Sequence, residues 1–250
     1  MGEGTNYTLL TGATSAIGEA IAVRLSKTRP LLLHGRDSAG LEKIKARCLE
    51  GTRHRVWQQD LCDLAAIPGS LEHFLNHSGA KVDTFIHAAG FIVRGPVRLT
   101  ALPQVQDSLA INFTSAQQIL TVLLKKRVNG ESLRNILAIS SIAARFGVRG
   151  HSAYCAAKAA LDGWIRALAV ELAPRVRANS LLLGPVATPA TEKILSEITV
   201  AQRISALCPM GVGKPQDGAG AVQCLLSDEM SWMTGQEIIM DGGFTTNATL

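Results

Sequence analysis

The stretch TGATSAIGEAIAVRL, residues 11–25, follows a short apolar run and decides how the chain folds. Gly12 allows a tight turn at the end of that run, and Gly18 allows the helix that follows to pack closely on its neighbours. The first turn of such a helix offers unpaired N–H groups and a positive dipole end to a phosphate. A glycine turn between an apolar strand and an amphipathic helix therefore predicts a dinucleotide-binding unit. The competing interpretation is an ordinary strand–helix turn.

Short apolar runs alternate with longer segments of helical periodicity along the whole chain. The runs predicted to be strands cover residues 7–12, 30–35, 53–60, 82–90, 134–141, 175–184 and 237–243. The predicted helices cover residues 17–28, 38–49, 64–77, 102–127, 152–173 and 216–227. This alternation predicts an α/β fold with a doubly wound parallel sheet of about seven strands and helices on both faces. No linker or repeat divides the sequence, so residues 1–250 are expected to form a single domain.

Composition and charge narrow the class of protein. Hydrophobic residues make up 47% of the chain, which is enough for a large core. The formal charge of +5 comes from scattered lysines and arginines without a dense basic block, so no nucleic-acid partner is expected. The five cysteines form no CxxC pair, so neither a metal site nor a disulfide framework is predicted. The sequence has no signal-peptide pattern and no apolar run of membrane-spanning length, which predicts a cytoplasmic protein.

The end of the second predicted strand, LLLHGRD, bears on the choice of cofactor. An acidic residue at this place binds the adenosine ribose hydroxyls of NAD(H), whereas an arginine accommodates the 2′-phosphate of NADP(H). Arg36 is well placed to meet a 2′-phosphate, and its fork of donors suits that group. Asp37 follows directly, and an acidic residue there would favour NAD(H). A further alternative is that Arg36 is only a surface charge and binds no cofactor. The sequence favours NADP(H), with NAD(H) as the alternative.

The helical segment SAYCAAKAAL, residues 152–161, carries a tyrosine and a lysine four residues apart. A helix brings such residues onto one face, with their Cβ atoms about 5–6 Å apart. The Lys158 ammonium is expected to favour the phenolate of Tyr154, which could then exchange a proton with a carbonyl or alcohol oxygen. Ser141 stands thirteen residues earlier at a strand end, where its hydroxyl can bind the same substrate oxygen.

Together these motifs resemble the short-chain dehydrogenase/reductase family, over about residues 7–244. TGATSAIG matches the family's T-G-x-x-x-[G/A]-x-G with Ala16 at the middle position, and residues 141–158 match its Ser-x12-Tyr-x3-Lys. The resemblance implies a Rossmann-type fold and an NAD(P)-dependent oxidoreductase. The chain departs from the family pattern at HAAG, where His87 replaces an asparagine and is expected to act as a hydrogen-bonding substitute, not as a catalyst. It also carries Gly184 and Pro185 in the order G-P.

The resemblance carries the family's site residues onto this chain at matching positions. The implied catalytic residues are Asn112, which interrupts its helix and holds a water for proton relay, with Ser141, Tyr154 and Lys158. The implied cofactor-binding residues are Gly12, Thr14, Ser15, Ile17, Gly18, Arg36, Asp60, Leu61, Ala88, Gly90, Tyr154, Lys158, Pro185, Val186 and Thr188. Within this set, Asp60 and Leu61 would border the adenine ring, and Lys158 would hold the nicotinamide ribose hydroxyls. No metal is expected.

The leading interpretation is an NADP(H)-dependent oxidoreductase that transfers hydride between nicotinamide and a carbonyl or secondary alcohol, with Tyr154 as general acid/base. The whole pattern looks closest to the 3-oxoacyl-[acyl-carrier-protein] reductase-like group, which makes a 3-oxoacyl thioester the first substrate candidate. Residues 91–93, 143–151 and 189–210 would set the choice of substrate, and the family's habit suggests a homotetramer or homodimer. The alternatives are an NAD(H)-dependent alcohol or sugar dehydrogenase of the same family, a non-catalytic dinucleotide-binding protein, and a nucleic-acid binder.

Overall fold

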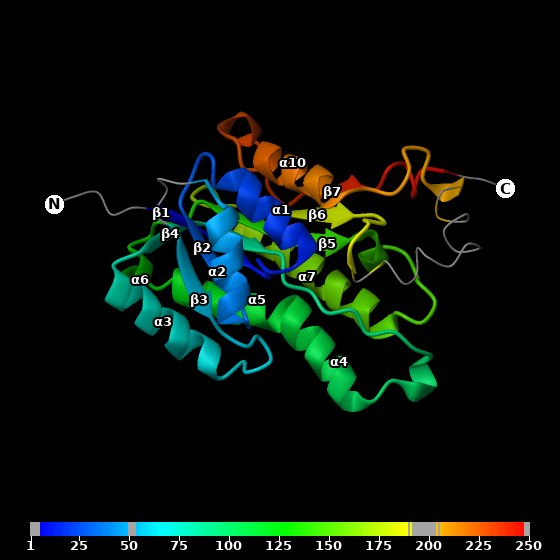
Figure 1. Ribbon diagram of the computed structural model, residues 1–250, viewed down its shortest axis with the longest axis horizontal. Coiled ribbons are helices and arrows are strands. Elements are labelled where there is room, and N and C mark those ends of the chain that lie inside the picture. Colours follow the sequence, from blue (N-terminus) through cyan, green and yellow to red (C-terminus); the bar gives the residue numbers. More distant parts are fainter. Residues whose placement is uncertain (1–5, 50–53, 190, 192–203, 205, 248–250) are drawn as a thin grey trace.

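A computed structural model describes residues 6–49, 54–189, 191, 204 and 206–247. Its centre is one parallel sheet with the strand order β3-β2-β1-β4-β5-β6-β7 (Figure 1). The strands are β1 (Asn6–Thr11), β2 (Leu31–Gly35), β3 (Arg55–Gln58), β4 (Lys81–His87), β5 (Asn135–Ser141), β6 (Arg177–Leu183) and β7 (Glu237–Met240). The predicted doubly wound sheet of seven strands is confirmed, and each of the seven predicted strands overlaps an observed one.

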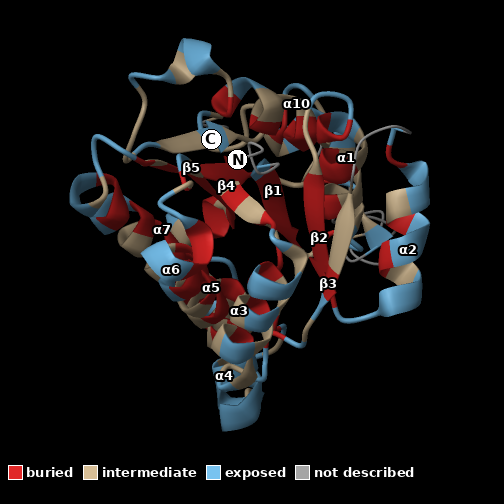
Figure 2. Ribbon diagram, turned by 90° about the vertical axis from the view of Figure 1, so that its left-hand side faces the viewer, coloured by how far each residue is buried: buried red, intermediate tan, exposed pale blue. Residues whose placement is uncertain are grey.

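Helices cover both faces of this sheet (Figure 2). The α-helices are α1 (Ala16–Leu25), α2 (Ser38–Arg47), α3 (Ala66–Ser78), α4 (Leu102–Leu109), α5 (Ser115–Leu123), α6 (Lys126–Asn129), α7 (Ser152–Glu171) and α10 (Pro215–Leu225). Side chains alternate along each strand, so Leu9 of β1 packs with α3, α5 and α7, whereas Leu10 packs with α1, α2 and α10. Two separate apolar layers therefore hold the sheet between them.

The prediction of one helix over residues 102–127 is wrong. Helix α4 ends at Leu109, a π-helix, η2 (Ala110–Thr114), follows, and α5 then continues to Leu123 before the short α6 begins. A π-turn inserts one extra residue into the helical repeat and is frequent at functional sites. The interruption occurs at Asn112, the residue for which the resemblance implies a broken helix.

The strand order changes direction between β1 and β4, which lie side by side although β2 and β3 come between them in the sequence. Ligands of doubly wound sheets bind beyond the carboxyl ends of the strands at such a switch point. The ends of β1, β4 and β5 therefore define the place where a site is expected. Over the described ranges, none of the helices combines the length and the apolar character that crossing a membrane requires.

Candidate active site

The turn after β1 forms a cradle that only small residues permit. Gly12 has φ of +68°, a left-handed conformation that favours glycine, and a β-carbon there would lie 2.7 Å from the Cα atom of Ala89. A β-carbon on Gly18 would overlap the carbonyl group of Gly12. The ends of β1 and β4 and the start of α1 therefore approach one another too closely for side chains at these two positions.

Ser15 begins helix α1 as its N-cap. Its Oγ accepts a hydrogen bond from the backbone N–H of Gly18 at 3.0 Å and donates one to the carbonyl oxygen of Gly12 at 2.8 Å. Thr14 and Ser15 are exposed, and Ile17 is partly buried against the α1 side of the core. The cradle and the start of a helix fit the pyrophosphate of a dinucleotide, because backbone N–H groups and a positive helix end face the same space. Gly12, Thr14, Ser15, Ile17 and Gly18 thus lie together as expected.

The end of β4 is fixed to β1 by a side chain that the sequence analysis did not single out. Thr11 Oγ1 accepts hydrogen bonds from the backbone N–H groups of Ala88 at 3.2 Å and Ala89 at 3.3 Å. Gly90 follows, and a β-carbon at that position would lie 3.3 Å from Asn112 Oδ1 and 3.7 Å from Lys158 Nζ. The segment Ala88–Gly90 therefore lies between the glycine cradle and the predicted catalytic residues.

His87 connects this strand end to the π-helix. Its Nδ1 lies 3.0 Å from Thr11 Oγ1, and its Nε2 lies 3.1 Å from the carbonyl oxygen of Ile111. Because Nε2 faces a carbonyl oxygen, it carries the proton, and Nδ1 accepts from the threonine hydroxyl. The pKa of His87 is lowered to about 3, first by burial and then by the charge of Lys158. His87 is therefore neutral, and its two hydrogen bonds agree with the part expected of a hydrogen-bonding substitute.

The end of β2 separates Arg36 from Asp37. The Asp37 carboxylate is the N-cap of α2 and accepts from the backbone N–H groups of Ala39 at 3.1 Å and Gly40 at 3.0 Å. Arg36 is exposed, and its carbonyl oxygen accepts a hydrogen bond from Gln58 Nε2 at 2.9 Å, which fixes the backbone beneath its side chain. The acidic side chain that complicated the choice of cofactor is therefore engaged in holding a helix.

Asp60 and Leu61 lie beyond the end of β3. Asp60 is exposed, and its Oδ1 accepts from the backbone N–H of Cys62 at 2.9 Å. Leu61 is only 3% exposed because its side chain packs into the core with Ile67 and Leu71. Its side chain is therefore part of the core, and only its backbone could meet a ligand.

Asn112 is completely buried in the π-helix. Its Nδ2 donates to the carbonyl oxygens of Phe91 and Ser108, each at 2.8 Å, and its Oδ1 accepts from the backbone N–H of Phe91 at 3.3 Å. The side chain thereby joins the segment after β4 to helix α4. It lies close to Lys158, because both approach Gly90.

Ser141 and Tyr154 face each other from β5 and α7. Ser141 ends β5, its Oγ accepts from the backbone N–H of Ala143 at 3.2 Å, and a hydrogen bond links it to the phenol of Tyr154. Burial raises the pKa of Tyr154 to about 12, the Ser141 hydrogen bond opposes the rise, and the Asp162 charge adds to it. The expected lowering of the Tyr154 pKa is therefore wrong for this structure, because the desolvation of the phenol outweighs the hydrogen bond.

Lys158 is 3% exposed and lies one turn further along α7. Its Nζ donates to the carbonyl oxygen of Ile139 at 2.9 Å and lies 5.9 Å from the centroid of the Tyr154 ring. Burial lowers the pKa of Lys158 to about 8, and the Asp162 carboxylate opposes that fall. The ammonium thus lies near both the tyrosine ring and Gly90. The Tyr–Lys spacing predicts only that these two side chains share one helix face.

The segment after β6 carries the last predicted cofactor residues. Val186 pairs with Gly213 in an isolated β-bridge, and Pro185 precedes it, partly buried. The backbone N–H of Thr188 donates to Thr191 Oγ1 at 2.9 Å, and the two threonine hydroxyls lie 3.1 Å apart. Within the ranges that the structure describes, no cluster of three or more His, Cys, Asp or Glu could hold a metal ion.

Of the three segments predicted to set the choice of substrate, residues 143–151 are joined to the chain just beyond residues 91–93. The backbone N–H of Gly95 donates to the carbonyl oxygen of Gly150 at 2.9 Å, which joins the segment after β4 to the loop before α7. Phe91 and Phe146, in these segments, expose 38% and 45% of their surface. Most of the third segment, residues 189–210, lies outside the described residues.

Sequence reasoning missed Thr11, Ser108 and Asp162. Thr11 and Ser108 hold backbone and amide groups of the site. Thr11 opens the TGATSAIG motif and Ser108 stands four residues before Asn112, but the motif spacing assigns neither side chain a part. Asp162 did carry a signal, because it stands four residues after Lys158 and continues the Tyr154–Lys158 face of the helix.

Comparison with known proteins agrees with this geometry. Residues 12–245 match the family described as enoyl-(acyl carrier protein) reductase. The chain is 30% identical to the 3-oxoacyl-[acyl-carrier-protein] reductase FabG of Thermotoga maritima, over 94% of this chain and 96% of that one. It is 33% identical to a cyclopentanol dehydrogenase of Comamonas testosteroni, over 72% of each chain.

Solved structures resemble the whole molecule. A provisionally assigned NAD(P)-dependent gluconate 5-dehydrogenase from Beutenbergia cavernae, with NADP bound at low occupancy, superposes with a TM-score of 0.89, at 29% identity and 98% coverage of both chains. A 4-hydroxyisoleucine dehydrogenase in complex with NADH shares the fold, with a TM-score of 0.88 at 24% identity, over 97% of this chain and 99% of that one. The match along nearly the whole sequence, the sheet order and the Ser-Tyr-Lys site together show that this chain belongs to the short-chain dehydrogenase/reductase family, whose members are oxidoreductases that act on alcohol and carbonyl groups with a nicotinamide dinucleotide.

Proposed function

We propose that this chain is an NADP(H)-dependent carbonyl reductase and that a 3-oxoacyl thioester is its substrate. The observation that carries the proposal is the placement of Tyr154, hydrogen-bonded to Ser141 and one helical turn from the buried Lys158. A phenol with a pKa of about 12 holds its proton at neutral pH and can give it to an oxygen on which negative charge develops. Reduction of a carbonyl group requires this direction of proton transfer.

Each polar residue of the site has a distinct part in this proposal. The bound NADPH supplies the hydride. Tyr154 donates the proton to the carbonyl oxygen, and the Ser141 hydroxyl donates a hydrogen bond to the same oxygen and stabilises its growing charge. Lys158 holds the ribose hydroxyls and places a positive charge near the phenol. Asn112 holds the backbone of Phe91 and the end of α4 in place around this ammonium.

Arg36 supports the preference for NADP(H). The Asp37 carboxylate caps α2, which ties both of its oxygens to backbone N–H groups, and the exposed guanidinium of Arg36 can meet a 2′-phosphate. The Beutenbergia cavernae relative binds NADP, which agrees with this assignment. The 4-hydroxyisoleucine dehydrogenase binds NADH, so the fold alone does not decide between the two cofactors.

Titration with NADPH and with NADH, followed by nicotinamide fluorescence, tests the preference. We expect NADPH to bind at least tenfold more tightly, and Arg36→Ala to abolish the difference while the affinity for NADH stays the same. Lys43→Ala is the matched control, because it removes an exposed positive charge from the neighbouring helix α2. Tighter binding of NADH by the unmodified chain would contradict the proposed preference.

Exposed apolar side chains in the segments that follow β4 and β5 support an apolar substrate. Phe91, Phe146 and Val148 are exposed, and the two segments are joined by the Gly95–Gly150 hydrogen bond. Such side chains suit the acyl chain of a thioester better than the hydroxyl groups of a sugar, and the Thermotoga maritima relative is a 3-oxoacyl reductase. The Comamonas testosteroni relative favours a second candidate, oxidation of an apolar cyclic alcohol.

A substrate panel separates these two candidates from a sugar dehydrogenase. We expect acetoacetyl thioester with NADPH to give the highest kcat/KM, cyclopentanol with NADP+ a lower one, and gluconate none. The second candidate predicts the reverse order for the first two substrates. Turnover of gluconate and of neither other substrate would contradict the proposal of an apolar substrate. The homotetramer or homodimer implied by the family stays a prediction.

A further inference from the structure

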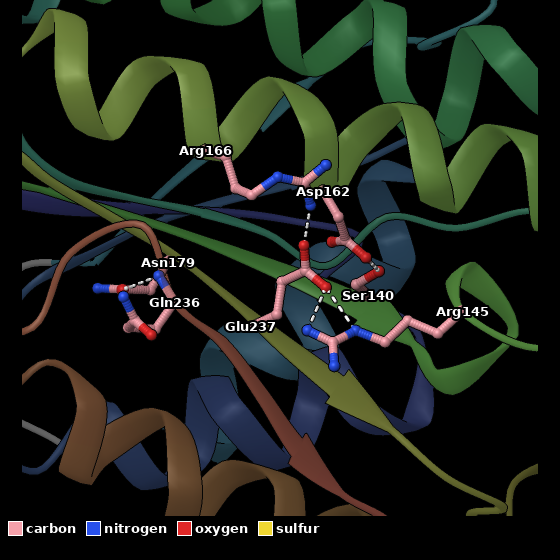
Figure 3. Close-up of polar contacts among 7 residues, drawn as sticks. All are labelled: Ser140, Arg145, Asp162, Arg166, Asn179, Gln236 and Glu237. Carbon is pink, nitrogen blue, oxygen red and sulfur yellow. Dashed lines mark hydrogen bonds and ion pairs between the residues drawn. The ribbon is translucent and has the colours of Figure 1, made fainter.

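Three successive residues at the end of β5 bind three residues on one face of α7. Ser141 hydrogen-bonds Tyr154, the carbonyl oxygen of Ile139 accepts from Lys158 Nζ at 2.9 Å, and Ser140 Oγ donates to Asp162 Oδ2 at 2.8 Å. Figure 3 shows the last of these contacts. Tyr154, Lys158 and Asp162 follow one another at a spacing of four residues, so they form one row along the helix. Asp162 thus lies on the same helix face as the two catalytic residues, and like them it contacts the end of β5.

The carboxylate of Asp162 is 2% exposed, and a buried charge is costly unless it faces a partner of opposite sign. The arginines near it are engaged elsewhere: Arg145 Nε donates to Glu237 Oε2 at 2.7 Å, and Arg166 pairs with Glu237 Oε1 (Figure 3). Lys158 is equally buried, one helical turn away, and interacts electrostatically with Asp162. These two buried groups of opposite charge therefore lie one helical turn apart on the same face of α7, and each is held by a residue at the end of β5.

We propose that Asp162 is a positioning residue for Lys158: its carboxylate is the buried counter-charge that keeps the Lys158 ammonium charged and directed between Tyr154 and Gly90. The proposal rests on the proposed function, in which this ammonium serves the tyrosine and the ribose. Without the counter-charge, the cost of burying the ammonium would favour its neutral form or a different position.

The neighbouring charged groups act on this pair from every packed element. The pKa of Asp162 is raised first by burial and also by the charge of Glu237 of β7. It is lowered by hydrogen bonds from Ser180 of β6 and Ser140 of β5 and by the charge of Lys158. The two arginines neutralise Glu237 and so limit its repulsion. On the other side, His87 of β4 is neutral. A cleft of about 460 Å³, lined by Ala144, Arg145, Ala159, Asp162, Arg166 and Glu237, brings the outer side of Asp162 near solvent.

The Asp162 carboxylate shifts the pKa values of both catalytic neighbours in the same direction. Its negative charge raises the pKa of Lys158, and it also raises that of Tyr154. Both groups therefore retain their protons to a higher pH than they would beside a neutral residue. A site that donates a proton to a carbonyl oxygen gains from this, because the acid form of the tyrosine is the reactive one.

The first test is the pKa of Lys158 in Asp162→Asn, measured by NMR on protein with 13Cε-labelled lysine and assigned with Lys158→Arg. Asparagine can still accept the Ser140 hydrogen bond, so the shape is kept and the charge is removed. We expect the pKa of Lys158, about 8 in the unmodified chain, to fall by about one pH unit or more. Asp228→Asn removes one exposed carboxylate and should leave it unchanged. An unchanged pKa in Asp162→Asn would overturn the proposal.

A reciprocal test does not depend on the folding of an Asp162 variant. Because the coupling between two sites is mutual, Lys158→Gln should raise the pKa of Asp162, read from 13Cγ-labelled aspartate, by about one pH unit or more. An unchanged pKa of Asp162 in Lys158→Gln would contradict a direct pair.

Kinetics separate the counter-charge from a merely structural part. In Asp162→Asn the alkaline limb of kcat/KM for reduction should move to lower pH, whereas a structural defect would lower the rate by the same factor at every pH. The NMR tests need no turnover. Coupled pKa values in a chain that reduces no carbonyl compound would therefore contradict the proposed function alone, and an active enzyme with uncoupled values would contradict only the part assigned to Asp162.

Discussion

At the scale of single residues, the site contains buried titratable groups, and burial shifts the pKa of each toward its uncharged form. Lys158 is 3% exposed and His87 is 1% exposed, and burial lowers the pKa of each, to about 8 and about 3. Tyr154 shows the opposite shift because its charged form is the anion. The protonation states that follow at pH 7 are a charged lysine, a neutral histidine and a protonated tyrosine, which together suit proton donation.

The pH dependence of reduction follows from Lys158. Its ammonium is present below a pH of about 8 and is lost as the pH rises through that value, so kcat/KM should fall about tenfold between pH 8 and pH 9.5. Initial rates of NADPH oxidation from pH 6 to pH 10 measure this. Lys158→Arg keeps its charge over the whole range, so any activity that remains should lack this limb. A profile of the unmodified chain that stays flat to pH 10 would contradict the assignment.

Replacement of His87 tests its structural part. His87→Leu leaves Thr11 Oγ1 and the carbonyl oxygen of Ile111 without their partner, which should lower the free energy of unfolding by about 1–3 kcal/mol. His87→Asn, the residue usual in the family, keeps a donor and an acceptor and should cost less. Urea unfolding measures both variants. An equal loss for the two substitutions would show that hydrogen bonding is not what His87 provides.

At the scale of elements, the sequence predicts those features that a local pattern of residues determines. The seven strands, the cradle and the Tyr154–Lys158 face rest on apolar runs, glycine spacing and helical periodicity. The break at Asn112 leaves no trace in the apolar pattern of residues 102–127, because α4 and α5 keep a helical course on either side of the π-turn. The contacts of Thr11 with Ala88 and Ala89 depend on β1 and β4 meeting, so no local pattern reports them, whereas the Ser108–Asn112 contact joins residues four apart.

The start of α1 supplies a prediction about the cofactor. Gly18→Ala places a methyl group against the carbonyl of Gly12, which must then shift, so NADPH affinity should fall at least tenfold. Gly69→Ala in α3 is the matched control: nothing lies within 4 Å of its β-carbon, so it should raise the free energy of unfolding by about 0.5–1 kcal/mol. Fluorescence titration and urea unfolding measure the pair. Full NADPH affinity in Gly18→Ala would refute the cradle as a binding feature.

At the scale of the whole molecule, the sheet lies between two apolar layers, and polar groups enter it at the strand ends. His34 and His87 are the buried histidines of β2 and β4, and burial lowers their pKa values to about 4 and about 3. Both are neutral in the folded chain and become charged in the unfolded chain below its pKa of 6.5. The stability of the sheet therefore depends on pH through these two histidines, and one of them, His87, also forms hydrogen bonds within the site.

Stability should fall with acid because of these histidines. Between pH 6.5 and about pH 4 the unfolded chain binds more protons than the folded one, so each histidine lowers the free energy of unfolding by about 1.4 kcal/mol per pH unit. Urea unfolding at pH 7, 6 and 5 measures the slope. His87→Asn should reduce the slope by about half, because one of the two groups is removed. A slope that does not change on this substitution would place the acid sensitivity elsewhere.

The most direct test of the account is single-turnover oxidation of bound NADPH by acetoacetyl thioester in the unmodified chain and in Tyr154→Phe. The phenylalanine keeps the ring and its packing but has no proton to give, so we predict unchanged NADPH affinity and a rate lower by about 10²–10⁴-fold. A Tyr154→Phe variant that turns over at the rate of the unmodified chain would contradict the claim that this tyrosine is the proton donor of a carbonyl reductase.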